Sequence, residues 1–303
     1  MIFIPATKET SKARFHLPGL FEFTALYRDF FAIKDRHPEY FYDHVEIASI
    51  YGAPATCLFG GGRYGYGQDD SEEVKELAAK YGYSARLTFS NSALDPKQFA
   101  DPAANALARS FEKEGNGIII YSDQLMAYLK ERYPAYYYVS STTKVLDDFA
   151  SFKQELLREE FRYVVADFRL NKSYEQLAAL DQNLKAKVEL LCNECCSPSC
   201  RSRKDCYENV SQRTIDPGIE EHRCPYSSCK GYSFAQAMAN PTFISNQDIL
   251  QHYLPMGISN FKIEGRGLGS ALIFEFLLYY LVKPQYHIHL REAIYLTSNL
   301  DLY

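Results

Sequence analysis

Cysteines are concentrated in one part of the 303-residue chain. Seven of its eight cysteines lie in a short region, with the spacings Cys192-x2-Cys195, Cys196-x3-Cys200-x5-Cys206 and Cys224-x4-Cys229. Thiols that are clustered in this way bind zinc or an iron–sulfur cluster, whereas disulfides are rare in the reducing cytosol that we expect for this chain.

The spacing of the thiols distinguishes between the two kinds of metal centre. Zinc ribbons favour two Cys-x2-Cys pairs, and here Cys192 and Cys195 alone have that spacing. Irregular spacing is compatible with a [4Fe–4S] cluster, because its four thiolates arrive from separate loops. We therefore predict a [4Fe–4S] cluster, with zinc as the alternative and buried free thiols as the remaining interpretation.

Charged residues follow two of the predicted strands, where they could transfer protons or bind anions. Glu194 follows the seventh strand and is a candidate general acid or base; alternatively, its carboxylate accepts hydrogen bonds from loop amides. Glu264 and Arg266 end the last strand, and an arginine there can bind a carboxylate or phosphate with two parallel hydrogen bonds. We predict all three as catalytic residues. The alternative for Glu264 is an internal ion pair that involves Lys262.

Uncharged polar residues also follow predicted strands, at Asn91, Ser140, Ser141 and Asn171. Side chains at such positions either contact a substrate or cap the next helix. For Ser140 and Ser141, which lie just before Thr143, we favour capping.

Short apolar segments alternate with longer amphipathic ones, which predicts alternating strands and helices. We expect eight strands, at residues 14–17, 45–50, 86–89, 117–121, 136–139, 163–166, 188–192 and 260–264. Helical spacing occurs at 72–80, 101–113, 122–132, 143–159 and 173–181, and the apolar segment 271–282 predicts a buried helix. This alternation indicates an α/β fold with a parallel sheet closed into a TIM-like (β/α)8 barrel. An open doubly wound sheet is the alternative, but no strand leads into Gly-x-Gly-x-x-Gly.

One region departs from this alternation. Residues 192–240 are long, lack clear periodicity and hold most of the cysteines. We predict a single barrel domain over residues 1–303, with a cysteine-rich loop at 192–240 inserted after the seventh strand. Loops of this length are usually functional or supported by a metal. Because this one leaves the end of a strand, it lies at the face where barrel active sites are found.

Composition limits the classes of function. The chain is 47% hydrophobic and 23% charged, which is typical of globular proteins, and its net charge of −5 disfavours long nucleic acids as partners. The first residues lack the apolar core of a signal peptide, and no segment approaches the length of a membrane span. We therefore expect a cytoplasmic protein without a membrane span.

Several motifs resemble those of barrel proteins related to peptidase family U32. Residues 193–203 (NECCSPSCRSR) resemble the family's N-E-G-C-x3-C-P-x-R segment, and residues 260–266 (NFKIEGR) resemble its F-K-I-x-G-R strand. The chain departs from the first motif at two positions. The glycine before the first cysteine is Cys195 here, and the proline after the second cysteine is Arg201.

The resemblance, which spans residues 51–266, implies a TIM-like barrel that often holds a [4Fe–4S] cluster. It implies Cys196 and Cys200 as ligands, with Cys224 as the third and Cys229 as the fourth. Relatives imply redox or group-transfer chemistry, similar to oxygen-independent hydroxylation, on a small molecule, a nucleobase or a peptide, with a protein partner or electron donor.

Other functions stay open beside this resemblance. The family name says peptidase, but the chain has neither a Gly-x-Ser-x-Gly elbow nor a His-Glu-x-x-His helix, so we do not expect peptidase activity. A zinc-stabilised barrel is one alternative, and a non-catalytic partner or scaffold subunit is another.

Overall fold

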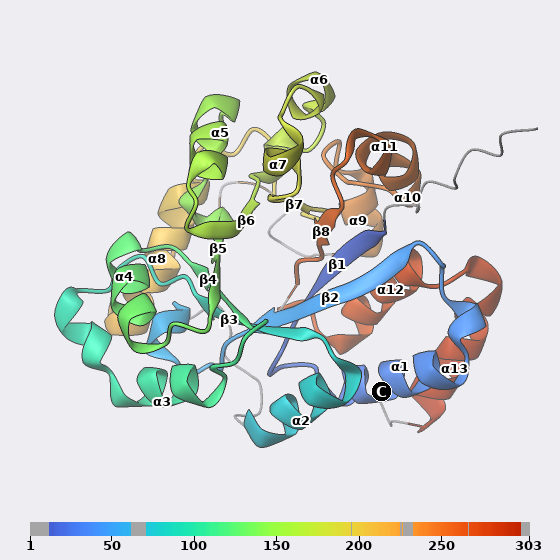
Figure 1. Ribbon diagram of the computed structural model, residues 1–303, viewed down its shortest axis with the longest axis horizontal. Helices are drawn as coiled ribbons and strands as arrows, with labels where there is room; N and C mark the ends of the chain where they lie inside the picture. The colour runs from blue at the N-terminus through green and yellow to red at the C-terminus, as the bar shows by residue number, and fades with distance from the viewer. Residues whose placement is uncertain are drawn as a thin grey trace, which may run out of the picture.

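Eight parallel strands form a closed barrel in sequence order in the computed structural model (Figure 1). The structure describes residues 12–61, 71–194, 196–224, 226, 233–265 and 267–297. The strands are β1 Ala13–Pro18, β2 Val45–Gly52, β3 Ser84–Phe89, β4 Gly117–Ile120, β5 Tyr137–Ser140, β6 Phe161–Val165, β7 Val188–Leu191 and β8 Asn260–Lys262. Each overlaps a predicted strand. Because β1 also pairs with β8, the sheet is closed, and the prediction of a TIM-like (β/α)8 barrel is confirmed.

The strands are buried on both faces, which explains why they occur in the sequence as short, nearly continuous apolar segments. Every residue of β4 and β7 is buried. One large core joins the barrel to the surrounding helices. A separate cluster of buried side chains is contributed by the strands alone: Tyr51, Ile119, Val139, Tyr163 and Val165. The barrel interior is thus packed with side chains rather than hollow.

Helices surround the barrel. They are α1 Thr24–Arg36, α2 Ser71–Tyr81, α3 Pro102–Ser110, α4 Asp123–Arg132, α5 Phe149–Leu157, α6 Tyr174–Ala178, α7 Gln182–Lys185, α8 Arg203–Ile215, α9 Phe234–Ala239, α10 Asn246–Asp248, α11 Leu254–Met256, α12 Ser270–Leu281 and α13 His287–Thr297. The buried helix predicted at 271–282 is α12, most of whose apolar side chains are buried. Within the described ranges, no helix is both long and apolar enough to span a membrane.

The prediction of one continuous helix over residues 143–159 is wrong for the first third of that range. A short 3-10 helix, η4 (Thr142–Lys144), ends at Val145, whose φ of 54° is left-handed. The α-helix α5 then begins after Asp148, whose carboxylate accepts a hydrogen bond from the backbone N–H of Ser151. The break contains neither glycine nor proline, so nothing in the residue types interrupts the helical spacing.

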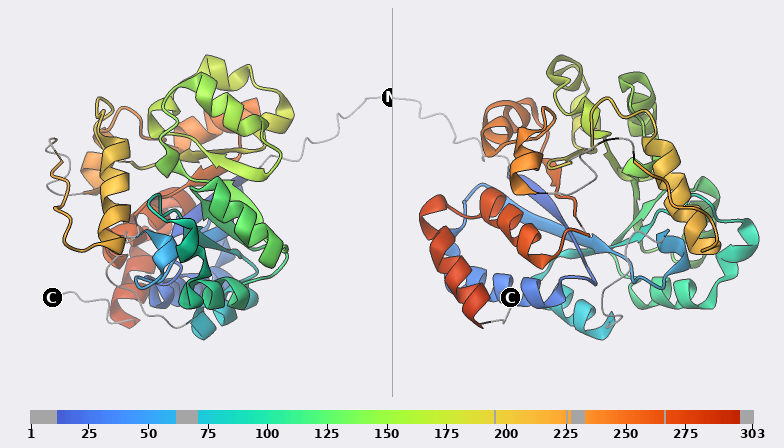
Figure 2. Two further views of the ribbon diagram at one scale, coloured as in Figure 1. Left: turned by 90° about the vertical axis from the view of Figure 1, so that its left-hand side faces the viewer. Right: turned by 180° about the vertical axis from the view of Figure 1, so that it is seen from behind.

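The cysteine-rich region after β7 is partly helical, which its sequence did not predict. It contains α8 and α9, and Figure 2 shows α8, in gold, against one end of the barrel. Two side chains of α8, Arg203 and Ser211, are buried. Because the helix is polar along its length, it has no apolar stripe from which it could be recognised.

Candidate active site at the barrel mouth

A pocket of about 480 Å³ opens at the end of the barrel where the strands finish. We call it the mouth pocket. Its strand-side lining includes Tyr51, Thr88, Ser90, Thr142, Lys262 and Glu264. Its other wall is α8, which contributes Cys206, Tyr207, Val210 and Arg213. Active sites of (β/α)8 barrels are built at this end, so the cysteine-rich segment borders the place where we expect chemistry.

Three hydroxyl groups in this pocket are buried without a hydrogen-bond partner in the described part of the chain. They are the side-chain oxygens of Thr88, Ser90 and Thr142. Thr88 is 5% exposed and Ser90 is 1% exposed. Because an unsatisfied buried hydroxyl is costly, these groups favour a polar occupant.

Other polar residues after strands have structural partners. The Ser141 hydroxyl caps η4 by accepting a hydrogen bond from the backbone N–H of Thr143, so the capping prediction is confirmed for this residue. Ser140 instead donates to Glu155 at 2.6 Å. The side-chain amides of Asn91 and Asn171 donate to backbone carbonyls and hold loops together.

Lys262 places a buried cation in the wall of the mouth pocket. Its ammonium nitrogen lies 3.9 Å from the centre of the Tyr51 ring and 3.7 Å from Oε1 of Glu189. The Tyr51 hydroxyl donates to the backbone carbonyl of Ile263 at 2.7 Å, which fixes the ring beneath the lysine. Lys262 therefore forms an internal ion pair with Glu189 of the neighbouring strand β7, a carboxylate other than the Glu264 of the prediction.

Glu189 joins the charged side chains in the barrel interior. Arg86 of β3 donates to its Oε2 at 2.6 Å, and Nε2 of His16 lies 3.5 Å from the same oxygen. Burial alone would raise the pKa of Glu189, but Arg86, His16 and Lys262 outweigh it and lower the pKa to about 2. Burial and the charge of Arg86 lower the pKa of His16 well below its usual value, so the imidazole is neutral. The four groups therefore have a net positive charge, because Arg86 and Lys262 are cations, Glu189 is the single anion and His16 is neutral.

Glu194 lies beside the mouth pocket rather than in its lining. Oε2 accepts a hydrogen bond from Arg203 at 2.5 Å, and Oε1 accepts one from the backbone N–H of Cys196 at 3.0 Å. Burial would raise the pKa of Glu194, but the charge and hydrogen bond of Arg203 hold it below its usual value. This geometry matches the alternative role, in which the carboxylate stays ionised and organises the loop.

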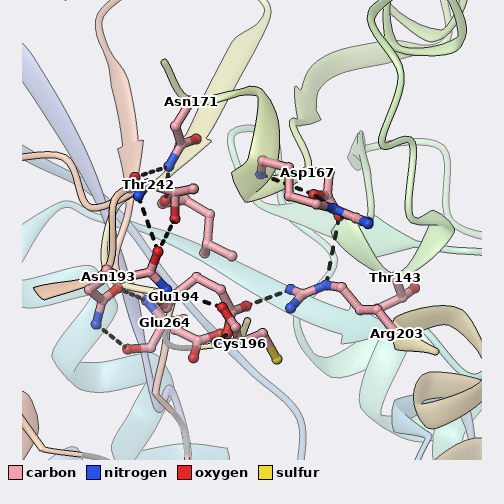
Figure 3. A network of polar contacts seen from close by, with 12 residues as sticks. Thr143, Asp167, Asn171, Asn193, Glu194, Cys196, Arg203, Thr242 and Glu264 are labelled. Carbon is pink, nitrogen blue, oxygen red and sulfur yellow. Dashed lines mark hydrogen bonds and ion pairs between the residues drawn. The ribbon is translucent and has the colours of Figure 1, made fainter. Parts of the chain in front are cut away.

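Arg203 links Glu194 to a second buried carboxylate (Figure 3). Its Nε lies 3.7 Å from Oδ2 of Asp167. The Asp167 carboxylate also accepts two hydrogen bonds from the guanidinium of Arg169 and one from its backbone N–H. The guanidinium packs over the rings of Phe168 and Tyr207. Asp167 and Arg203 were not identified from the sequence. Asp167 directly follows a predicted strand, so it could have been found by the argument that identified Glu194.

Glu264 is the predicted catalytic residue that does line the mouth pocket. Its backbone is fixed by Asn193, whose side-chain oxygen accepts from the Glu264 N–H at 2.8 Å and whose amide donates to the Glu264 carbonyl at 3.1 Å. A side-chain hydrogen bond with Glu264 also contributes to the lowered pKa of Glu194, so the two carboxyl groups meet. The third predicted catalytic residue, Arg266, lies outside the described residues.

Three of the four predicted cysteine ligands lie in the described part of the chain. Cys200 is buried, and its carbonyl accepts from Arg169 at 3.2 Å; Cys196 and Cys224 are partly buried. Cys229 lies outside the described residues. Among the residues that are described, no three His, Cys, Asp or Glu side chains are arranged to hold a metal ion. The [4Fe–4S] cluster stays a prediction.

We expect Glu189→Gln to weaken the dependence of stability on acid pH. Below the unfolded-state pKa of 4.5 the unfolded chain binds a proton, whereas folded Glu189 stays ionised until about pH 2. The wild-type free energy of unfolding should therefore fall as the pH decreases through this window, by about 3 kcal/mol from this group. Urea unfolding at several pH values measures the slope, with Glu76→Gln on α2 as the control. An unchanged slope in Glu189→Gln would contradict this assignment.

Replacing Arg203 should leave buried carboxylates without their cation. We expect Arg203→Met to lower the free energy of unfolding by about 3–5 kcal/mol, and the further change Glu194→Gln to restore part of the loss. A double-mutant cycle by urea unfolding measures this coupling, with Lys204→Met on the exposed side of α8 as the control. Simple additivity of the two changes would show that the pair is not coupled.

Comparison with known proteins adds a similarity of fold. No family model and no curated protein matches the sequence. Among solved structures, that of the U32 peptidase Mk0906 is similar, with 14% sequence identity and a TM-score of 0.48 over 86% of this chain and 96% of that chain. The family resemblance of the motifs remains a prediction.

Proposed function

We propose that the chain is an enzyme that binds a small anionic molecule in the mouth pocket and modifies it there. The observation that carries the proposal is the buried lysine of this pocket, Lys262, beside three buried hydroxyls without partners. A buried cation is costly unless an anion lies close to it. Glu189 is shared between Lys262 and Arg86, and Lys262 lines the pocket, so its ammonium group can also bind an anionic group of a substrate.

The hydroxyls define the polarity of the proposed substrate. Thr88, Ser90 and Thr142 come from segments on the β3 and β5 side of the pocket, whereas Lys262 comes from β8. A molecule with an anionic group at Lys262 and further polar groups toward the hydroxyls would satisfy both sides. Sites built from such fixed polar groups discriminate strongly against ligands that leave them unpaired.

Glu264 is the proposed proton-transferring residue. Its side chain lines the same pocket as Lys262, two residues away on the same strand end, and Asn193 fixes its backbone. A carboxyl group at this position can donate a proton to, or accept one from, a bound molecule. Glu194 acts in this proposal as a positioning residue, because Arg203 and the Cys196 amide occupy its oxygens.

The cysteine-rich segment is proposed to carry a [4Fe–4S] cluster through Cys196, Cys200, Cys224 and Cys229. Such a cluster supplies one-electron transfer or, at an iron without a protein ligand, a Lewis acid. Support comes from the residue types and from location, since Cys206 of the same segment lines the mouth pocket. Zinc is the alternative, and the segment would then be structural.

Metal analysis tests the cluster directly. We expect protein purified without oxygen to contain about four irons and four acid-labile sulfides per chain. Cys196→Ser and Cys200→Ser should lose this content, while Cys57→Ala, at a buried cysteine outside the segment, should keep it. Stoichiometric zinc without sulfide would show that the segment holds a structural zinc ion instead of the cluster. Full iron content in both serine variants would refute the ligand assignment.

Ligand-induced stabilisation tests the substrate site. We expect at least one member of a panel of small carboxylates and phosphate monoesters to raise the melting temperature of the wild type, because binding to the folded state stabilises it. Lys262→Met should lose this increase, measured against the melting temperature of the same variant without ligand. Ser90→Ala should weaken it. If no member raises the wild-type melting temperature, or if Lys262→Met retains the increase, the proposed site is wrong.

A further inference from the structure

A second pocket, of about 290 Å³, opens at the opposite end of the barrel, where the strands begin. We call it the lower pocket. Residues at the starts of β1, β2, β3, β5 and β6 line it together with the segment before β4. This end of a (β/α)8 barrel normally serves stability rather than chemistry, so a polar pocket here needs its own explanation.

Arg86 places a buried guanidinium in the lining of the lower pocket. The residue is 1% exposed. Its Nη1 donates to Glu189 at 2.6 Å, and its Nε donates to the Tyr137 hydroxyl at 2.8 Å. Neither bond uses Nη2. Arginine presents its nitrogens in a rigid planar arrangement that matches carboxylate and phosphate oxygens, so the unused nitrogen of Arg86 is suited to an anion in the pocket.

His16 provides a second buried polar group in this lining. It is 0% exposed, and its Nδ1 is hydrogen-bonded to the Ser49 hydroxyl at 2.8 Å. Its Nε2 forms no hydrogen bond in the described part of the chain and lies 3.5 Å from Oε2 of Glu189. Because His16 lines the lower pocket, a small ligand that fills the pocket would lie beside this ring.

The rim of the lower pocket adds further positive charge. Arg14, Lys113 and Arg162 line it, against Glu46 and Glu114. Nε of Arg14 lies 3.4 Å from Glu46. Lys113 and Arg162 form no ion pair among the described residues. The Arg162 guanidinium instead packs against aromatic rings, 4.7 Å from the centre of the Tyr137 ring.

We propose that the lower pocket is a binding site for a phosphate or carboxylate group of a small molecule. Arg86 would contact the anion from inside the barrel and Arg162 from the rim, while Tyr137 orients both guanidiniums. The volume suits a small molecule rather than a polymer. This site does not depend on the mouth pocket, since none of the residues that line it also line the mouth pocket.

Titration calorimetry at constant ionic strength tests the site, with inorganic phosphate in one series and malonate in another. We expect the wild type to bind at least one of the two, and the preferred probe identifies the anion. Arg162→Ala and Lys113→Ala, both at exposed positions, should weaken binding, with Arg162→Ala reducing affinity by about tenfold. Arg132→Ala is the matched control, because Arg132 packs on Tyr128 of α4 outside both pockets. Lys262→Met should bind the probe like the wild type.

A second readout locates the bound anion. The imidazole nitrogens of His16 should shift in NMR spectra as the probe is added, and this shift should disappear in Arg162→Ala. Absence of binding by both probes would overturn the proposal. A shift of the His16 signals that survives Arg162→Ala, or a shift that is lost in Lys262→Met, would also overturn it by placing the anion elsewhere.

Discussion

The carboxylate of Glu189 organises the charged interior of the barrel. Arg86, His16 and Lys262 approach it from three other strands, and its lowered pKa of about 2 reflects their combined effect. Because buried charges are tolerated only with close partners, this one carboxylate fixes the positions of two buried cations. Arg86 is thereby held at the lower end of the barrel and Lys262 at the upper end, so the same carboxylate contacts one cation in the lining of each pocket.

A second buried interaction positions the wall of the mouth pocket. Arg203 is the first residue of α8, and its contacts with Glu194 and Asp167 connect that helix to the ends of β7 and β6. The helix itself buries few side chains. Its orientation over the barrel therefore rests on the Arg203 guanidinium and on the buried Ser211, whose hydroxyl accepts a hydrogen bond from the backbone N–H of Ser92 at 3.2 Å.

The fold was predictable because buried parallel strands form short apolar segments that are easily located. Their number and alternation with helices indicated the barrel. The position of the mouth pocket and the candidate residue Glu264 were predictable because active sites of (β/α)8 barrels lie at the carboxyl ends of the strands. What could not be predicted depends on pairing across the barrel: Glu189 lies within an apolar strand, and nothing local shows that it meets Arg86 and Lys262. The burial of Arg203 was hidden for a similar reason, because the polar sequence of α8 resembles a solvated loop.

The mouth pocket is lined by two parts of the chain, the ends of the barrel strands and α8. This division has a consequence for how the protein can evolve. Residues of α8 such as Tyr207 and Val210 face the mouth pocket, yet they belong to an inserted segment that contributes little to the core. Under the proposed function, the residues that contact the ligand from α8 and the residues that form the barrel core lie in different stretches of the sequence. Substitutions confined to one helix can alter which molecule fits, while the strands that supply Lys262 and Glu264 remain untouched. Substitutions in α8, whether natural or engineered, could therefore change the preferred ligand while the barrel fold stays the same.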